Sequence, residues 1–584
     1  MATAAATQKK LAGAFYTPTP IAHFLVTWAV RKPSDWILDP GAGNGVFLRA
    51  ALHRLRTLGM VSSEPQVFAV ELDATTASLM DAKLREEFGP ASVWVVGGRD
   101  FFTLQPAALG QAKALHGTLP LVDAVVGNPP YIRYHYFSGP TRQLALKAAE
   151  DTGVRLSGLT SSWAPYVIHA AKFLKPRGRL ALVLPAELLH ADYAAPVRQW
   201  LVANFADITV VTFVERVFPG ALEDVILLLA QHGPTPRNGA SVNLVQLRNL
   251  DDLDNLTDAP SLPRAELDMW AGKWTGLLLY AEDRYLVQEL LSHPAMDSLG
   301  AVATIDIGVV TGADKFFLVS DADAQYWHIE PEYLRPAVSK AADINGAVFG
   351  PEDWNALRRE GKRAWLLDVS APQTAIKHGV RTYLEHGSTR LGICTRYKIR
   401  TRSPWHRVPG VYAPDAFMTY MSYDHPRLTL NRAHAVSTNT VHRVRFTHEV
   451  DPEVVVASFY NTLTLLSAEL VGRHYGGGVL KLETKEAESV RVPIRLKDTL
   501  QERVKELLPS IDELVRRRRF SELRNGLDAV VLGDGLGLST GEIHRLWDIY
   551  DRLRSRRLAK NRSAHVQPSR ARRLSSHLSL DSMG

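Results

Sequence analysis

The sequence predicts an α/β protein that begins with a doubly wound, Rossmann-like parallel sheet and continues into a mixed α+β part and C-terminal helices. Three observations carry this prediction. Up to about residue 230, short apolar runs alternate with stretches of helical periodicity. Several of these runs end in glycines, acids or prolines, which suit ligand sites at the carboxyl ends of parallel strands. Beyond residue 240 the alternation is lost.

The expected strands of the first part are Trp36–Asp39, Val67–Glu71, Val93–Val96, Val122–Val126, Leu180–Leu184, Ile208–Phe213 and Val225–Ala230. The expected helices include Val46–Leu58, Ala74–Phe88 and Trp163–Leu174, with Gln501–Arg519 and Thr540–Leu558 near the end of the chain. The Gly/Pro-rich stretch 231–240, "QHGPTPRNGA", is interpreted as a domain boundary. The predicted parts are therefore 11–232, 241–495, a helical segment 496–558 and a basic, Ser-rich tail 559–584 that we expect to be disordered.

The composition bounds the function. With 584 residues, 46% of them hydrophobic and 22% charged, the chain is expected to form more than one globular domain. A net charge of +7 permits an anionic partner. The single cysteine, Cys394, argues against a disulfide framework or a cysteine-based zinc site. The most apolar run, Val225–Ala230, is too short to span a bilayer, so we expect a cytoplasmic protein without a membrane segment.

Three successive strands end in residues that suit a nucleoside ligand. In "WILDPGAGNGVFLRA", Gly41, Gly43 and Gly45 allow a tight curl before a helix start, whose N–H groups attract polar ligands. The next strand ends in Glu71, placed to accept hydrogen bonds from ribose hydroxyls. The third is followed by Asp100 and Phe101, which suit an adenine amino group and ring. A tight turn and two surface acids are the competing interpretations.

The fourth strand stops at "NPPY", Asn128, Pro129, Pro130 and Tyr131, because two prolines cannot continue a hydrogen-bonded ladder. The simpler interpretation is a strand followed by a stiff turn. The alternative is that a rigid Asn side chain and a Pro carbonyl are held at the ligand-binding edge of the sheet.

Together these motifs resemble the γ-class, TaqI-type DNA adenine-N6 methyltransferases of restriction–modification systems, over about residues 11–232. "GAFYTP", with Tyr16, Thr17 and Pro18, is similar to the family motif that helps hold the methionine end of S-adenosylmethionine. "DPGAGNG", with Asp39, and the acids Glu71 and Asp100 match its cofactor motifs, and "NPPY" its catalytic motif. "ERVFPG" (215–220), with Phe218, matches its base-stacking motif. The resemblance implies S-adenosylmethionine as cofactor, double-stranded DNA as partner, a target-recognition role for the C-terminal half, and a separate cognate restriction endonuclease as a further partner.

The chemistry implied for "NPPY" is the activation of an exocyclic amine. Two acceptors, the Asn128 side-chain oxygen and the Pro129 carbonyl, would hold the two amino hydrogens, with Pro130 keeping that carbonyl rigid. The Asn128 side chain is also expected beside the cofactor. Tyr131 would stack on an adenine flipped out of the duplex. Phe218 would offer a second face by family analogy, or would be a core residue beside a turn. Neither a metal nor a strong base is required.

Basic residues in other segments are candidates for DNA contact. Arg396, Lys398, Arg400 and Arg402 alternate, so in an extended strand they would share one face, along a phosphate backbone or simply in solvent. His474 and Lys481 flank three glycines, which suits close approach to DNA or a hairpin turn. Arg133 opens the segment 133–162, whose glycines and polar residues predict a loop that orders only on DNA.

Several alternatives stay open. "NPPY" also occurs in N4-cytosine DNA methyltransferases and in protein-glutamine methyltransferases, and the long C-terminal half argues against the latter. A DNA-binding protein with an inactive methylase domain is a non-enzyme alternative, opposed by the intact motifs. "EGK" (360–362) and "ETK" (483–485) imitate fragments of a nuclease site but lack a convincing partner acid. No oligomeric state and no base-reading residue are predicted.

Overall fold

The computed structural model describes residues 17–565, except 63, 108–116, 216, 219–224, 234–240, 254–272, 371–374 and 476–477. The chain forms two compact units, with the boundary between Ala281 and Glu282. The first unit contains the N-terminal sheet, and the second contains most of the remaining chain up to Leu558.

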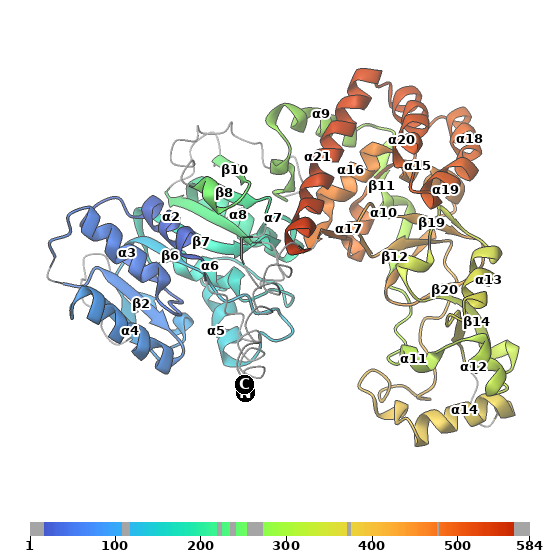
Figure 1. Ribbon diagram of the computed structural model, residues 1–584, viewed down its shortest axis with the longest axis horizontal. Coiled ribbons are helices and arrows are strands. Elements are labelled where there is room, and N and C mark those ends of the chain that lie inside the picture. Colours follow the sequence, from blue (N-terminus) through green and yellow to red (C-terminus); the bar gives the residue numbers. More distant parts are fainter. Residues whose placement is uncertain are drawn as a thin grey trace, which may run out of the picture. The chain divides into compact units, whose positions relative to one another are not determined.

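The first unit is built on an eight-stranded sheet with the order β10-β8-β9-β7-β6-β1-β2-β3 (Figure 1). Neighbouring strands are parallel, except that β9 runs antiparallel to both β7 and β8. The strands are β1 (Ile37–Asp39), β2 (Val67–Glu71), β3 (Val93–Gly97), β6 (Val122–Gly127), β7 (Leu174–Pro185), β8 (Phe205–Phe213), β9 (Val225–His232) and β10 (Ser241–Leu247). Two short strands, β4 (Gln105–Pro106) and β5 (Thr118–Leu119), form a separate parallel pair.

Helices cover both faces of this sheet, which is why its central strands are apolar throughout. One apolar cluster joins the sheet to α2 (Thr19–Ala29), α3 (Val46–Thr57) and α4 (Ala74–Phe88). A second cluster lies on the opposite face, where the helices are α5 (Gly139–Glu150), α6 (Trp163–Ala171), α7 (Glu187–His190) and α8 (Ala195–Asn204). Ile37 and Leu38 of β1 are both fully buried, one in each cluster.

The strand order reverses beside β1. The chain passes outward from β1 through β2 to β3 and then returns to β6, on the other side of β1. In open parallel sheets such a switch point leaves a crevice at the carboxyl ends of the two strands, where ligands bind. The glycine-rich loop follows β1 and "NPPY" follows β6, so both predicted motifs lie at this edge.

The predicted α/β class and all seven predicted strands of the first part are confirmed. The boundary at 231–240 is wrong, because Ser241–Leu247 returns to the sheet as β10 and pairs with β8 over its whole length. The segment expected to order only on DNA contains the helix α5, which packs its alanines in the second apolar cluster.

The second unit combines several small sheets with helices. Its largest sheet has the order β12-β21-β17-β19-β15, and a four-stranded sheet has the order β13-β16-β14-β20. Its strands are β11 (Met296–Ser298), β12 (Ala303–Asp306), β13 (Leu318–Val319), β14 (Leu334–Val338), β15 (Val348–Phe349), β16 (Trp365–Leu367), β17 (Ala416–Thr419), β18 (Met421–Ser422), β19 (Leu428–Asn431), β20 (Val436–Ser437), β21 (Val441–Phe446), β22 (Arg473–Tyr475), β23 (Val479–Lys481) and β24 (Arg491–Pro493).

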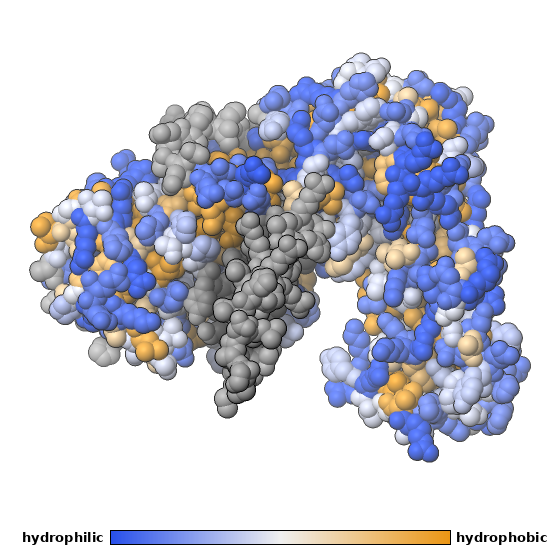
Figure 2. All heavy atoms as spheres, in the orientation of Figure 1, coloured by the Kyte–Doolittle hydropathy of each residue, from blue (hydrophilic) through white to orange (hydrophobic). Residues whose placement is uncertain are grey.

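Helices that lie wholly or mostly in this unit are α9 (Ala281–Leu291), α10 (Leu299–Val302), α11 (Asp314–Phe317), α12 (Asp321–Tyr326), α13 (Pro351–Arg359), α14 (His378–Thr389), α15 (Pro452–Phe459), α16 (Thr462–Val471), α17 (Thr484–Ser489), α18 (Asp498–Glu506), α19 (Leu508–Arg516), α20 (Phe520–Asp528) and α21 (Thr540–His565). The C-terminal helices present a largely hydrophilic surface in the view of Figure 2.

Two expectations for the C-terminal part need correction. The segment 496–558 is not a separate domain, since the buried Asp528 carboxylate accepts hydrogen bonds from Thr462 in the same unit. The helix α21 runs through the start of the predicted tail to His565, beyond which the residues lie outside the described part of the chain.

Within the described residues, no single helix is long and apolar enough to cross a membrane. The pair α15 and α16, bent by 78°, passes that test only when taken together. Both helices are almost entirely buried in the second unit.

Candidate active site

The glycine-rich loop folds back over the end of β2. Positive φ angles at Gly43 (51°) and Gly45 (78°) turn the chain sharply, and Gly45 is the N-cap of α3. The Gly43 N–H donates to Glu71 Oε2 at 2.9 Å, and the other Glu71 oxygen accepts from the Asp73 N–H at 2.9 Å. The structure therefore brings together the loop and the acid that the sequence predicts to share a ligand.

Asp39 is the last residue of β1 and lies beside Gly127, the last residue of β6. Its Oδ1 accepts from the Gly41 N–H at 3.2 Å, and a side chain at Gly127 would place its Cβ 2.9 Å from the same oxygen. Asp39 is fully buried, and its Oδ2 has no hydrogen-bond partner among the described residues. Burial raises the pKa of Asp39 to about 7, the Gly41 hydrogen bond opposes this, and the nearby Glu71 charge adds to it.

Asp100 caps the turn that follows β3. Its Oδ1 accepts from the Phe102 N–H at 3.0 Å, and its Oδ2 accepts from the Thr141 hydroxyl of α5 at 2.6 Å. Phe101 is only 5% exposed, with its ring centroid 4.7 Å from that of His169. In this structure the Phe101 ring therefore packs on protein side chains rather than standing open toward a ligand.

Tyr166 of α6 is a site residue that the sequence analysis missed. Its hydroxyl is buried and has no hydrogen-bond partner within the described ranges. Burial raises its pKa well above the ordinary value, and the charges of Asp39, Glu71 and Asp100 raise it further. A Cβ on Gly41 would lie 2.6 Å from this hydroxyl. Because the surrounding helix is apolar, no local pattern distinguishes Tyr166 from a core residue.

The "NPPY" turn is held from two sides. The Asn128 side-chain N–H donates to the Thr17 hydroxyl at 3.1 Å, which sets the orientation of the amide. Thr17 directly precedes Pro18, the N-cap of α2, so the end of "GAFYTP" lies beside "NPPY". Tyr16 lies outside the described residues.

On the other side of the turn, Ser162 contacts the backbone around Tyr131. The Ser162 hydroxyl donates to the Pro130 carbonyl and accepts from the Ile132 N–H at 2.8 Å. The Ser162 N–H donates to the Ile132 carbonyl at 3.0 Å. Nothing in "LSGLTSS" distinguishes Ser162 from its polar neighbours in the sequence, since the contact depends on the fold.

The two rings predicted to hold a base do not face each other here. Tyr131 packs against the cluster on the α6 face, whereas Phe218 is 3% exposed in the cluster on the α2 and α3 face. Phe218 is a core residue in this structure, because the apolar dipeptide Val217–Phe218 joins the buried layer. Stacking by Phe218 would require this segment to move.

Two family models match successive parts of the chain. "N-6 DNA Methylase" matches residues 1–269, and "Type II methyltransferase M.Eco57I, C-terminal domain" matches residues 271–532. The chain belongs to the N6-adenine DNA methyltransferase family. The γ-class resemblance fits this family.

Curated relatives extend over most of this methyltransferase. Type II methyltransferase M.XamI of Xanthomonas campestris pv. amaranthicola is 27% identical over 497 residues, which cover 82% of this chain and 85% of the relative. Type II methyltransferase M.AccI of Acinetobacter calcoaceticus is 22% identical over 483 residues, covering 80% and 83%. The solved structure of the Type IIL restriction-modification enzyme MmeI in complex with DNA aligns with a TM-score of 0.55 at 13% identity, covering 92% of this chain and 75% of that one. This last likeness shows the fold.

The basic stretch of the methyltransferase's second unit is not a strand. Residues 397–401 form consecutive turns, with the Arg400 N–H donating to the Arg396 carbonyl at 2.9 Å. Arg396, Lys398 and Arg400 are exposed. Arg402 donates to the Val310 carbonyl at 2.9 Å, and burial lowers its pKa. The predicted row of four cations on one strand face is therefore wrong, although three of them face solvent.

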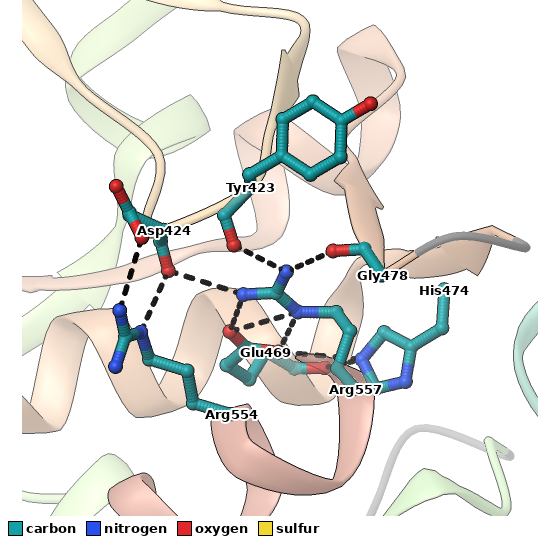
Figure 3. A network of polar contacts seen from close by, with 7 residues as sticks. All are labelled: Tyr423, Asp424, Glu469, His474, Gly478, Arg554 and Arg557. Atoms are coloured by element: carbon teal, nitrogen blue, oxygen red, sulfur yellow. Dashed lines mark hydrogen bonds and ion pairs between the residues drawn. The ribbon is translucent and has the colours of Figure 1, made fainter. Parts of the chain in front are cut away.

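His474 and Lys481 have partners within the protein. The Lys481 ammonium lies 2.6 Å from the Glu483 carboxylate and 4.9 Å from the Tyr420 ring centroid. His474 lies 3.4 Å from Glu469, which is paired with Arg557 (Figure 3). Both side chains thus stabilise their own unit, in contrast to the DNA contact expected from sequence.

Proposed function

We propose that this chain transfers a methyl group from S-adenosylmethionine to N6 of an adenine flipped out of double-stranded DNA. The observation that carries the proposal is the meeting of two motifs at the switch point of the sheet. The Asn128 amide of "NPPY" is oriented by Thr17, and the carboxylate-rich ends of β1, β2 and β3 lie along the same edge.

The residues present fit the cofactor. Two buried polar atoms, Asp39 Oδ2 and the Tyr166 hydroxyl, have no partner among the described residues. Both residues lie beside Gly41, where a larger residue would place its Cβ 2.6 Å from the Tyr166 hydroxyl. Such atoms are costly unless a ligand satisfies them. Asp39 and Tyr166 would hold a polar, cationic part of the ligand, Glu71 its ribose and Asp100 its adenine. The bound cofactor would supply a methyl group on a sulfonium centre.

The reactive nitrogen of adenine is a weak nucleophile because its lone pair is delocalised into the ring. The Asn128 side-chain oxygen and the Pro129 carbonyl would accept hydrogen bonds from its two hydrogens and thereby localise the lone pair on nitrogen. Pro130 fixes the Pro129 carbonyl, so little reorganisation is needed. One of the two hydrogens is released to solvent after transfer. Tyr131 would stack on the extruded ring.

DNA contacts are proposed for the exposed cations Arg133, Arg396, Lys398 and Arg400, which would bind phosphates. The second unit would then take part in target recognition. Protection of DNA from a separate cognate restriction endonuclease would be the biological role.

A single-turnover assay with labelled S-adenosylmethionine tests the proposal. The wild-type protein should label DNA, and Asn128→Ala should be slower by about 100- to 1,000-fold, as expected when one pre-organised polar group is removed. DNA binding by this variant should stay within about tenfold, because phosphate contacts dominate affinity. A near-normal rate for Asn128→Ala would contradict the assigned role of "NPPY".

A further inference from the structure

One serine holds both peptide groups that flank Tyr131. The Pro130 carbonyl belongs to the peptide before Tyr131, and the Ile132 N–H belongs to the peptide after it. The Ser162 hydroxyl donates to the first and accepts from the second at 2.8 Å. The Ser162 backbone N–H adds a third bond, to the Ile132 carbonyl at 3.0 Å.

These bonds fix the backbone of Tyr131. A rotation about either Tyr131 dihedral moves one flanking peptide group relative to the other and breaks a bond to the same hydroxyl. Pro130 already restricts the preceding dihedral. Ser162 is itself 3% exposed and immediately precedes α6, whose residues lie in the apolar core, so the hydroxyl is anchored to a rigid element.

We propose that Ser162 is a positioning residue for methyl transfer, which clamps Tyr131 so that its ring meets the extruded base at the distance and angle needed for reaction. This inference rests on the proposed function, because it assumes that Tyr131 stacks on the base. It goes beyond that function in assigning a role to a residue outside every motif recognised in the sequence. A residue that only stabilises the fold would affect the rate whether or not Tyr131 is present. A clamp on Tyr131 should affect the rate only when the Tyr131 side chain is present.

The test uses the full chain and DNA that the wild-type protein methylates. Ser162→Ala removes the hydroxyl and should lower the single-turnover rate at saturating DNA and cofactor by about 10- to 100-fold, since small misplacements of a reacting group have effects of this size. The dissociation constants for DNA and S-adenosylmethionine should change by less than about threefold, because binding is dominated by other groups. Ser162→Thr keeps the hydroxyl and should restore most of the rate.

Ser161→Ala is the matched control. Ser161 is the adjacent residue, is 6% exposed, and its hydroxyl interacts with Tyr193 rather than with the "NPPY" turn. This variant should methylate DNA at a rate close to that of the wild type. Should Ser162→Ala fail to fold, Ser162→Cys, which keeps the volume but is a weak hydrogen-bond donor, should show the same kind of rate loss.

A double-mutant cycle distinguishes the clamp from a structural anchor. In a Tyr131→Ala background the rate loss caused by Ser162→Ala should disappear, because the group that it positions is gone. Equal losses in both backgrounds, or a wild-type rate for Ser162→Ala, would overturn the inference. If the wild-type protein methylates no DNA, it is the proposed function that has failed.

Discussion

Replacing Arg557 by Met should destabilise the second unit more than any surface ion-pair change. The Arg557 side chain is fully buried, and its guanidinium contacts both oxygens of Glu469, which is 1% exposed (Figure 3). It also donates to the backbone carbonyls of Tyr423, Asp424 and Gly478 at 2.5–3.1 Å. These bonds connect the C-terminal helix α21 to α16 and to Gly478, which directly precedes β23.

The expected loss of unfolding free energy follows from the groups that Arg557→Met would leave buried without their ion-pair or hydrogen-bond partner. Glu469 would remain buried and would keep its contact with His474 but lose its ion pair, and three carbonyls would lose a donor. Removing one partner of a buried ion pair costs about 3–5 kcal/mol. Arg503→Met is the matched control, because Arg503 and Asp534 form a pair at 2.9 Å in which both side chains are more than half exposed. Such surface pairs contribute less than about 1 kcal/mol.

Amide hydrogen exchange of α16 and α21 in a urea series measures the unfolding free energy of this unit directly. Burial alone would raise the pKa of Glu469, but hydrogen bonds from His474 and Arg557 lower it to about 2. The stabilisation should therefore be complete above the ordinary carboxyl pKa of 4.5 and should be lost as the pH falls toward 2. A loss for Arg557→Met no larger than that for Arg503→Met would refute this reasoning.

Two further predictions concern the cofactor and DNA. Because burial raises the pKa of Asp39 to about 7, a cationic cofactor should bind more tightly as the pH rises through that value and ionises the carboxyl. Calorimetry should show proton release on binding, and Asp39→Asn should abolish that release; equal proton release by both proteins would contradict the assignment. Replacing Arg396 and Arg400 together by Ala should weaken DNA binding, while bound DNA is still methylated. The slope of the logarithm of the binding constant against the logarithm of the salt concentration should fall by the equivalent of about two phosphate contacts. An unchanged salt dependence of DNA binding would show that these arginines do not contact the DNA.

The sequence was sufficient for seven of the eight strands of the first sheet and for placing the predicted motifs at one edge of it. Parallel strands buried on both faces are continuous apolar runs, and the residues at or just after the end of such a run, among them Asp39, Glu71 and Asn128, are predicted to lie at the carboxyl edge of the sheet. The hydrogen bond between Asn128 and Thr17 was not predicted, although the resemblance assigned both residues to the cofactor site.

Features that depend on distant parts of the chain were not predictable in this way. Alternating cations suggested a strand at 396–402, yet Ile399 is the one buried apolar anchor there and Tyr397 between the cations is 76% exposed, so no strand face is buried. The β10 strand follows a Gly/Pro-rich break and is defined by pairing with β8. Ser162 and Tyr166 gain their contacts only when α6 packs beside β1 and β6.

Nucleoside analysis of DNA methylated by the wild-type protein tests the central claim most directly. After incubation with S-adenosylmethionine carrying a labelled methyl group, the DNA is digested and its nucleosides are separated by chromatography. The account predicts that the label elutes with N6-methyladenine and that Asn128→Ala gives almost none. Label in N4-methylcytosine would show that the same acceptors serve a different exocyclic amine. No label in any nucleoside would contradict the assignment of this site to DNA methylation.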